Sequence, residues 1–96
     1  MNFDFSPTKN NTLKQERGIC FEDVIYCIEN DMLLDILEHP NKEKYSKQKI
    51  YIVAIEKYAY LVPFVENDKK IFLKTIFPSR KATKIYLTEQ EDKVCH

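Results

Sequence analysis

The sequence contains little glycine and little cysteine, and each scarcity excludes a class of protein. Among 96 residues the only glycine is Gly18. Loops that cradle phosphates need several positions without a Cβ, so enzymes that depend on nucleotide cofactors are excluded. The 3 cysteines are odd in number and lack C-x-x-C spacing. We therefore expect no structural disulfide, no metal site and no cofactor.

Long apolar runs are also missing. The longest uncharged apolar stretches, such as residues 58–65, fall far short of the roughly 20 residues that span a bilayer. The N-terminus MNFDFSPTKN carries an early acid where a signal peptide would carry basic and then apolar residues. Hydrophobic residues make up 44% of the chain and charged residues 31%, which is typical of a globular domain. These features predict a soluble, cytoplasmic protein with no membrane partner.

Charge is balanced in total but not along the chain. The 15 basic residues equal the 15 acidic residues in number. Residues 1–41 hold 3 basic and 8 acidic residues, whereas residues 42–84 hold 11 basic and 4 acidic residues. Six bases lie between residues 69 and 84 without an acid, namely Lys69, Lys70, Lys74, Arg80, Lys81 and Lys84. This density suits RNA or an acidic protein surface, although a solvated lysine-rich face would look the same.

Helix signals occupy the first third of the chain and return near its end. Ser6 as N-cap and Pro7 in the first turn open a helix that Gly18 closes. A second helix is amphipathic, with a core-facing side made of Phe21, Val24, Ile25 and Ile28. A third, short helix is expected over residues 79–87, with Ser79 as its cap.

Strand signals begin the chain and dominate its second half. Residues 1–5 alternate apolar and polar types, and residues 33–37 form a short apolar run. Three runs of β-forming residues follow, IYIVAI, YAYLVPFV and IFLKTIF, and the tight turns between them predict a meander. Pro63 within the second run cannot donate to the ladder, so it predicts a bulge or an outward-facing edge position.

Together these elements predict an α+β domain over residues 1–87. An antiparallel β-meander sheet would pack against the two N-terminal helices, with a short C-terminal helix added at the end. Residues 88–96 form a polar tail.

Three short motifs are spread over nearly the whole chain. The first contains Phe3, Asp4, Phe5 and Lys9, the second contains Gly18, Ile19, Phe21 and Glu22, and the third contains Ser79, Arg80, Lys81, Ala82 and Thr83. Their order and spacing resemble the BrnT family of toxins from type II toxin–antitoxin systems. The resemblance implies a RelE-like α+β fold and a ribonuclease that arrests translation. It also implies a cognate antitoxin, a small DNA-binding protein, that neutralises the toxin.

Metal-free cleavage of RNA needs a base for the 2′-hydroxyl group and cations for the charge that builds on the phosphate. The candidate catalytic residues are Arg80, Lys81, Lys49 and Glu56. Arg80 is favoured because its planar guanidinium matches phosphate oxygens. The candidate base is Glu56, or a lysine whose pKa is lowered by neighbouring positive charges. Lys69, Lys70, Lys74 and Lys84 are candidates for binding RNA, free or on the ribosome. We expect Lys49 and the bases of residues 69–84 to form one contiguous positive surface.

Other reactive side chains have structural interpretations that we favour. His39 lies within the turn sequence Glu38-His39-Pro40 and is expected to be an exposed loop residue, and the terminal His96 is discounted. Cys20 and Cys27 are expected to be small buried hydrophobic residues, and the strand tyrosines to pack across strands. A second function class stays open: a non-catalytic protein-binding module. It would be a degenerate toxin that only partners its antitoxin, or an inhibitor of a protein target such as gyrase.

Overall fold

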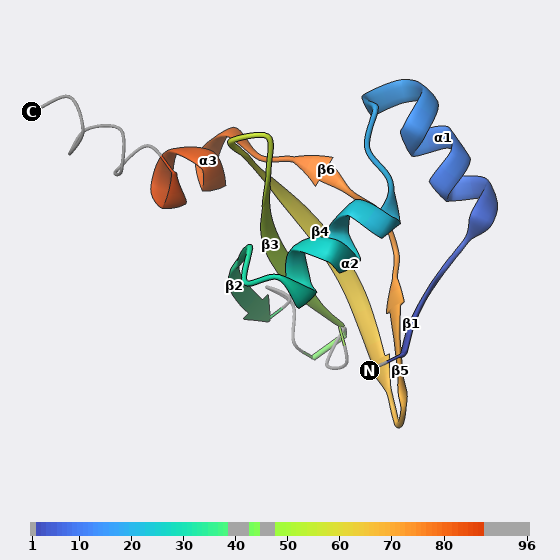
Figure 1. The fold of residues 1–96 in the computed structure, drawn as a ribbon. Coiled ribbons are helices and arrows are strands. Elements are labelled where there is room, and N and C mark those ends of the chain that lie inside the picture. Colours follow the sequence, from blue (N-terminus) through green and yellow to red (C-terminus); the bar gives the residue numbers. More distant parts are fainter. Residues whose placement is uncertain (1, 39–42, 45–47, 88–96) are drawn as a thin grey trace, which may run out of the picture.

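The computed structural model describes residues 2–38, 43–44 and 48–87, which form three helices and a mixed six-stranded sheet (Figure 1). The elements follow in the order β1 (Asn2–Phe5), α1 (Pro7–Arg17), α2 (Phe21–Glu29), β2 (Leu33–Glu38), β3 (Gln48–Ile55), β4 (Tyr58–Asn67), β5 (Lys70–Leu73), β6 (Phe77–Pro78) and α3 (Arg80–Tyr86). The predicted α+β class is confirmed, and the predicted tail lies outside the described residues. No helix in the described ranges is long and apolar enough to cross a membrane.

The capping residues of α1 act as the sequence predicts. Ser6 Oγ accepts a hydrogen bond from the N–H of Lys9 at 3.2 Å, and Pro7 occupies the first turn. Gly18 adopts φ 69°, and its N–H donates to the carbonyl of Lys14. A residue without a Cβ enters this left-handed conformation at little cost, so the helix ends here.

Asn10 joins the two N-terminal helices, and nothing in the sequence pattern predicted this role. Its side chain is only 5% exposed. Oδ1 accepts from the N–H of Phe21 at 2.7 Å, and Nδ2 donates to Glu22 Oε1 at 2.8 Å. The first bond satisfies one of the N–H groups that the start of α2 leaves unpaired. The second bond lowers the pKa of Glu22.

The sheet has the strand order β1-β5-β4-β3-β2, and β6 pairs with β4 beside this path. Strands β2 to β5 pair antiparallel, as the predicted meander requires. Strand β1 instead pairs parallel with β5, with Phe3 opposite Ile71. The prediction of a purely antiparallel sheet was therefore wrong. Strand β1 adds to the outer edge of β5, and the register of this pair places Phe3 and Phe5 against the core cluster.

The third β-rich run of the sequence forms two separate strands, β5 and β6, and Pro63 of β4 lies opposite the residues between them. Strand β4 pairs with β5 toward one end and with β6 toward the other. Between these partners the carbonyl of Pro63 accepts from the N–H of Lys74 at 2.8 Å. The N–H and C=O of a strand residue point to the same neighbour, so the missing N–H of Pro63 faces this interruption. The proline thus removes no bond to β3, although β4 is a central strand.

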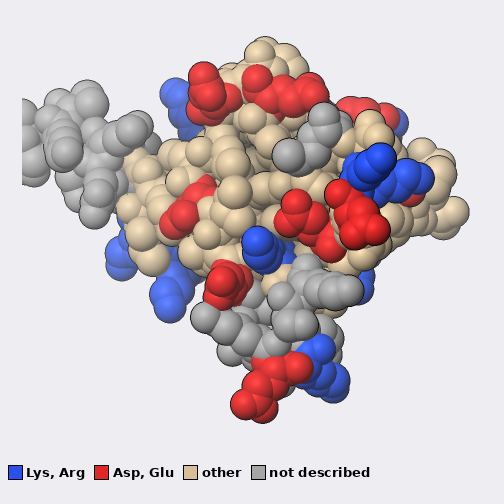
Figure 2. Space-filling model, turned by 90° about the horizontal axis from the view of Figure 1, so that it is seen from below, with Lys and Arg blue, Asp and Glu red and all other residues tan. Residues whose placement is uncertain are grey.

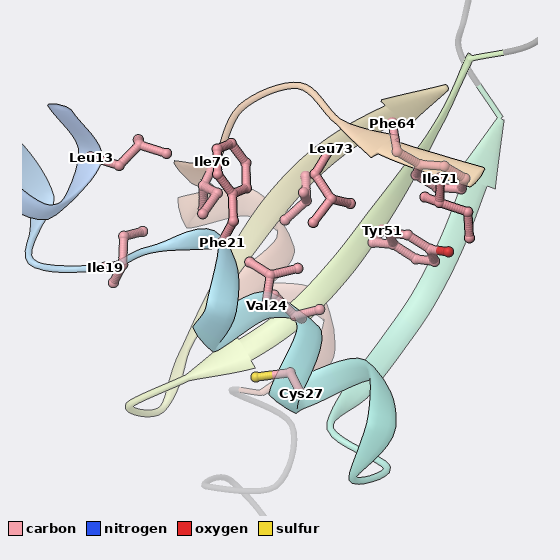
Figure 3. Packing of buried hydrophobic residues seen from close by; sticks show 12 residues of the cluster. Leu13, Ile19, Phe21, Val24, Cys27, Tyr51, Phe64, Ile71, Leu73 and Ile76 are labelled. Atoms are coloured by element: carbon pink, nitrogen blue, oxygen red, sulfur yellow. The ribbon is translucent and has the colours of Figure 1, made fainter. Parts of the chain in front are cut away.

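Alternation along the strands gives the sheet two different faces. The first, here called the core face, packs against α1 and α2 through Leu13, Ile19, Phe21, Val24, Cys27, Tyr51, Val53, Val62, Phe64, Ile71, Leu73 and Ile76 (Figure 3). The second, here called the open face, includes Ile52 and Ala59 under α3. Phe21 and Val24 are fully buried as predicted, whereas Ile25 and Ile28 are only half-buried. Cys27 takes the third buried position of α2.

Candidate functional site

Helix α3 carries the third motif, and three of the five motif residues hold it against β4. Ser79 Oγ caps the helix by accepting from the N–H of Ala82 at 3.1 Å. Thr83 Oγ1 accepts from the N–H of Ala59 at 2.8 Å and donates to the carbonyl of Ser79 at 2.8 Å. Ala82 is buried against Ile52 and Ala59. The serine, alanine and threonine of the motif therefore have structural roles.

The other two motif residues, Arg80 and Lys81, are exposed, and so is Lys84. Helical spacings of one, three and four residues gather these cations on the side of α3 opposite the buried Ala82 and the half-buried Tyr86. Residues 80–86 contain no acid. The outer side of α3 is thus a basic surface, and its position is fixed by the contacts of the inner side.

The far end of α3 is tied to β2, which is an edge strand. Tyr86 Oη donates to Asp35 Oδ2 at 2.6 Å, and Asp35 Oδ1 accepts from the N–H of Ile36 at 2.7 Å. The hydrogen bond from Tyr86 lowers the pKa of Asp35, and the same bond raises the pKa of Tyr86. The two residues are 51 positions apart, so no local pattern could have paired them.

The candidate catalytic residues do not all converge. Glu56 lies in the turn between β3 and β4, at the end of the sheet where α3 begins. The N–H of Ser79 donates to the carbonyl of Ala59 at 3.0 Å, which brings the start of α3 next to this turn. Lys49 lies near the other end of β3, about 23 Å away along the strand. The structure therefore places the backbone at the start of α3 near the turn that contains Glu56 and separates Lys49 from both.

The candidate RNA-binding lysines are spread out as well. Lys69 and Lys70 lie at the turn between β4 and β5, far from α3, and Lys74 follows β5. Lys49 pairs with the core-face residue Phe64. Leu73 pairs with Phe64 and therefore also lies on the core face. Lys70 is three residues before Leu73, an odd number, so its side chain lies on the face opposite to that of Lys49. Figure 2 shows one side of the molecule, on which basic and acidic side chains are interspersed. The prediction of one contiguous positive surface was therefore wrong.

Among the other reactive side chains, Cys27 and Tyr51 are buried in the core, whereas Cys20 is only partly buried, so the prediction that Cys20 is buried was wrong. Cys27 is 4% exposed, and burial raises the pKa of its thiol and also that of Cys20. Protonated thiols are poor nucleophiles. Tyr51 stacks on Phe64 with ring centroids 3.9 Å apart, so it is not available to stack on a base. His39 lies outside the described residues, as does His96. Within the described ranges no group of His, Cys, Asp and Glu side chains could hold a metal ion.

The open face leaves apolar side chains in contact with solvent. Of the described helices, only α3 lies over this face, and it covers the end that contains Ile52 and Ala59. Away from α3, the register places Leu37 beside Ile50 and Phe72 beside Val65. Leu37 is 40% exposed and Phe72 is 37% exposed. Sequence alternation could have found these positions, but only the tertiary structure shows that they lie beyond the reach of α3.

Comparisons of the chain with protein-family models, curated proteins and solved structures found no match. The function therefore has to be argued from the chain's own side chains. Two features carry chemistry: the basic outer side of α3 next to the turn that contains Glu56, and the exposed apolar part of the open face.

Proposed function

We propose that the chain is the toxin of a type II toxin–antitoxin system, with a RelE-like fold. It acts as a metal-independent ribonuclease that arrests translation, and a cognate antitoxin neutralises it. The observation that carries this proposal is the construction of α3. Ser79, Ala82 and Thr83 fix the helix on β4, so that Arg80 and Lys81 are presented to solvent in a defined position. The BrnT-like order of the three motifs supports the same function.

In the proposed reaction, Arg80 and Lys81 hold the scissile phosphate and balance the charge that develops on its oxygens. Glu56 accepts the proton of the 2′-hydroxyl group, whose oxygen then attacks the neighbouring phosphorus. The bond from phosphorus to the 5′-oxygen breaks, and that oxygen takes a proton from Lys81 or water. The products are a 2′,3′-cyclic phosphate and a free 5′-hydroxyl group. Lys84 and Lys74 contact the flanking nucleotides.

A second candidate function is a non-catalytic protein-binding module. It is favoured by the distance between Lys49 and Glu56 and by the exposed apolar residues Leu37 and Phe72 on the open face. In this case the chain would bind its antitoxin without cutting RNA, or would inhibit a protein target such as gyrase.

The two functions are distinguished by inducing the protein alone in cells and following the incorporation of labelled methionine and thymidine. Early loss of methionine incorporation supports the ribonuclease, and early loss of thymidine incorporation supports a gyrase-directed inhibitor. The purified protein should also cleave RNA in the presence of EDTA. Arg80→Ala with Lys81→Ala should slow this cleavage by about 10²-fold, as loss of a charge-stabilising contact does in other enzymes.

The matched control is Lys14→Ala with Arg17→Ala, which removes two exposed bases from α1. This control should keep full cleavage and full growth arrest. Circular dichroism melting shows whether each variant is folded. A folded Arg80→Ala/Lys81→Ala variant that still arrests growth would contradict the proposed site.

A further inference from the structure

A groove of about 280 Å³ lies between α2 and the turn that joins β3 to β4. It is lined by Gly18, Ile19, Asp23, Tyr26, Cys27, Met32, Ala54, Ile55 and Glu56. Ile19 and Cys27 are buried and form part of its floor, whereas the side chains of Asp23 and Glu56 are exposed. The groove therefore combines buried apolar residues with two exposed carboxylates, and Asp23 also caps α2 by accepting from the N–H of Cys20 through Oδ2 at 3.1 Å.

Two large side chains that line the groove, those of Tyr26 and Met32, are exposed to solvent. Tyr26 is 58% exposed and Met32 is 42% exposed. Next to them, a Cβ added at Gly18 would meet no atom within 4 Å, so this side of the groove is open. An aromatic ring and a thioether beside carboxylates provide a surface for a group that has both a positive charge and an apolar stem.

We propose that this groove binds an arginine or lysine side chain from a basic segment of a partner polypeptide. The ring of Tyr26 offers a face to the cation, and the carboxylates of Asp23 and Glu56 complement its charge. Met32 and Ile55 contact the aliphatic stem. The volume lies just below the range of about 300–1,000 Å³ that is typical of small-molecule sites. It suits one long side chain.

The charged residues near the groove also favour a basic partner segment. Residues 21–32, which form α2 and the turn after it, hold 4 acidic residues and no base, and the exposed bases Arg17 and Lys57 lie next to the groove residues Gly18 and Glu56 along the chain. The exposed acids of α2 and the turn that follows it are Glu22, Asp23, Glu29 and Asp31. Such a surface attracts a basic segment and repels the phosphates of RNA. The inference therefore does not rest on ribonuclease activity, and it holds whether or not α3 binds RNA.

The test uses the full-length protein with ¹³C-labelled methionine and isoleucine methyl groups. The probe is the tripeptide acetyl-Leu-Arg-Leu-amide, added in a titration followed by NMR. Saturable shifts at Met32, Ile19 and Ile55, with little change at Ile71 or Ile76, are expected. The same tripeptide with citrulline in place of arginine has nearly the same shape and no charge. It should bind at least threefold more weakly, and equal binding would overturn the proposal.

Variants separate this groove from the α3 site. Asp23→Asn should weaken binding of the arginine tripeptide about threefold, and adding Glu56→Gln should bring the loss to about tenfold. Glu29→Gln removes an exposed charge from the same helix outside the groove, and it should leave binding unchanged. Because Glu56 is also the proposed base for RNA cleavage, Asp23→Asn alone tests the groove without touching that reaction.

Besides equal binding of the citrulline tripeptide, the inference would be overturned by the absence of a saturable shift at the groove, by unchanged binding in the double variant, or by an equal loss in Glu29→Gln. A dilution series without the tripeptide tests a second copy of the chain as the occupant. Shifts of Met32 and Ile55 that depend on protein concentration would show self-association through the groove and would also overturn it.

Discussion

Helices α2 and α3 lie against opposite faces of the sheet and are attached by different forces. On the core face, Phe21 and Val24 of α2 have no exposed surface. On the open face, Ala82 is the only fully buried residue of α3. The N–H of Ala59 donates to Thr83 Oγ1, Tyr86 Oη donates to Asp35, and partly buried side chains such as Leu61 and Leu87 pack against the cluster that contains Ala82. Helix α2 is therefore held mainly by burial of large apolar side chains, whereas α3 combines specific polar contacts with a smaller apolar cluster around Ala82.

This difference indicates that the packing of α2 contributes more to the stability of the fold, whereas the polar contacts of α3 fix the orientation of that helix. Full burial of a large apolar side chain contributes about 1.5–3 kcal/mol, whereas a hydrogen bond contributes about 0.5–1.5 kcal/mol net. We therefore expect α3 to open locally at a lower free energy than the core around α2. The hydrogen bonds of α3 are directional, so they hold the helix in one orientation, and this orientation sets where Arg80 and Lys81 point into solvent.

The largest expected effect is on the core face. Phe21→Ala should lower the free energy of unfolding by about 3–5 kcal/mol, because it removes the ring that stacks on Phe5 and leaves a cavity. Urea unfolding followed by circular dichroism measures this loss. The control Tyr26→Ala, at an exposed position of the same helix, should change stability by less than about 0.5 kcal/mol. Similar losses in both variants would mean that α2 is not held by its buried face.

A smaller effect is expected at the anchor of α3. Thr83→Val keeps the side-chain shape but leaves the N–H of Ala59 without its acceptor, which should cost about 1–3 kcal/mol. Hydrogen exchange at Ala59 and within α3 should accelerate, while exchange at Val24 should change less. Thr12→Val is the control, because its hydroxyl bonds to the carbonyl of Thr8 in an exposed position. Unchanged exchange at Ala59 would contradict the anchoring role of Thr83.

A gain in stability is expected in the turn that supports the start of α3. Glu56 and Lys57 have φ values of 52° and 67°, as a two-residue type I′ turn requires. Replacing them with Asn and Gly should raise the free energy of unfolding by about 1 kcal/mol, since these residues adopt positive φ at lower cost. The same replacement at Asp68 and Lys69 is the control, because positive φ does not occur there. A gain at both turns would show that strain at Glu56 and Lys57 is not the cause.

The smallest effect is expected at the partly buried hydrogen bond between Tyr86 and Asp35, and it should depend on pH. The lowered pKa of Asp35 means that the bond stabilises the fold above about pH 4 and that this contribution is lost on acidification. The raised pKa of Tyr86 means that the contribution persists below about pH 10 and is lost as alkali removes the phenol proton. The melting temperature of the parent should therefore exceed that of Tyr86→Phe mainly between these limits. A difference that is constant from acid to alkali would exclude the bond as its source.

The sequence by itself determined the features that depend on neighbours along the chain. Helices begin at Ser6 and Ser79 because their side-chain oxygens accept N–H groups of the first turn. Helix α1 ends at Gly18 because glycine adopts positive φ at little cost. Alternation and β propensity located the meander strands, and helical spacing identified Phe21 and Val24 as buried. The basic outer side of α3 followed from the spacing of Arg80, Lys81 and Lys84 in the same way.

The tertiary structure alone decided the features that join distant segments. The parallel pairing of β1 with β5, the cap that Asn10 provides for α2 and the bond between Tyr86 and Asp35 link residues with no common local pattern. In the site, the separation of Lys49 from Glu56 follows already from the strand between them, whereas only the bond from Ser79 to Ala59 shows that the start of α3 lies beside the turn that contains Glu56. A strand advances about 3.3 Å per residue. Lys49 and Glu56 are close in sequence, but the strand between them holds their side chains too far apart to act on the same phosphate.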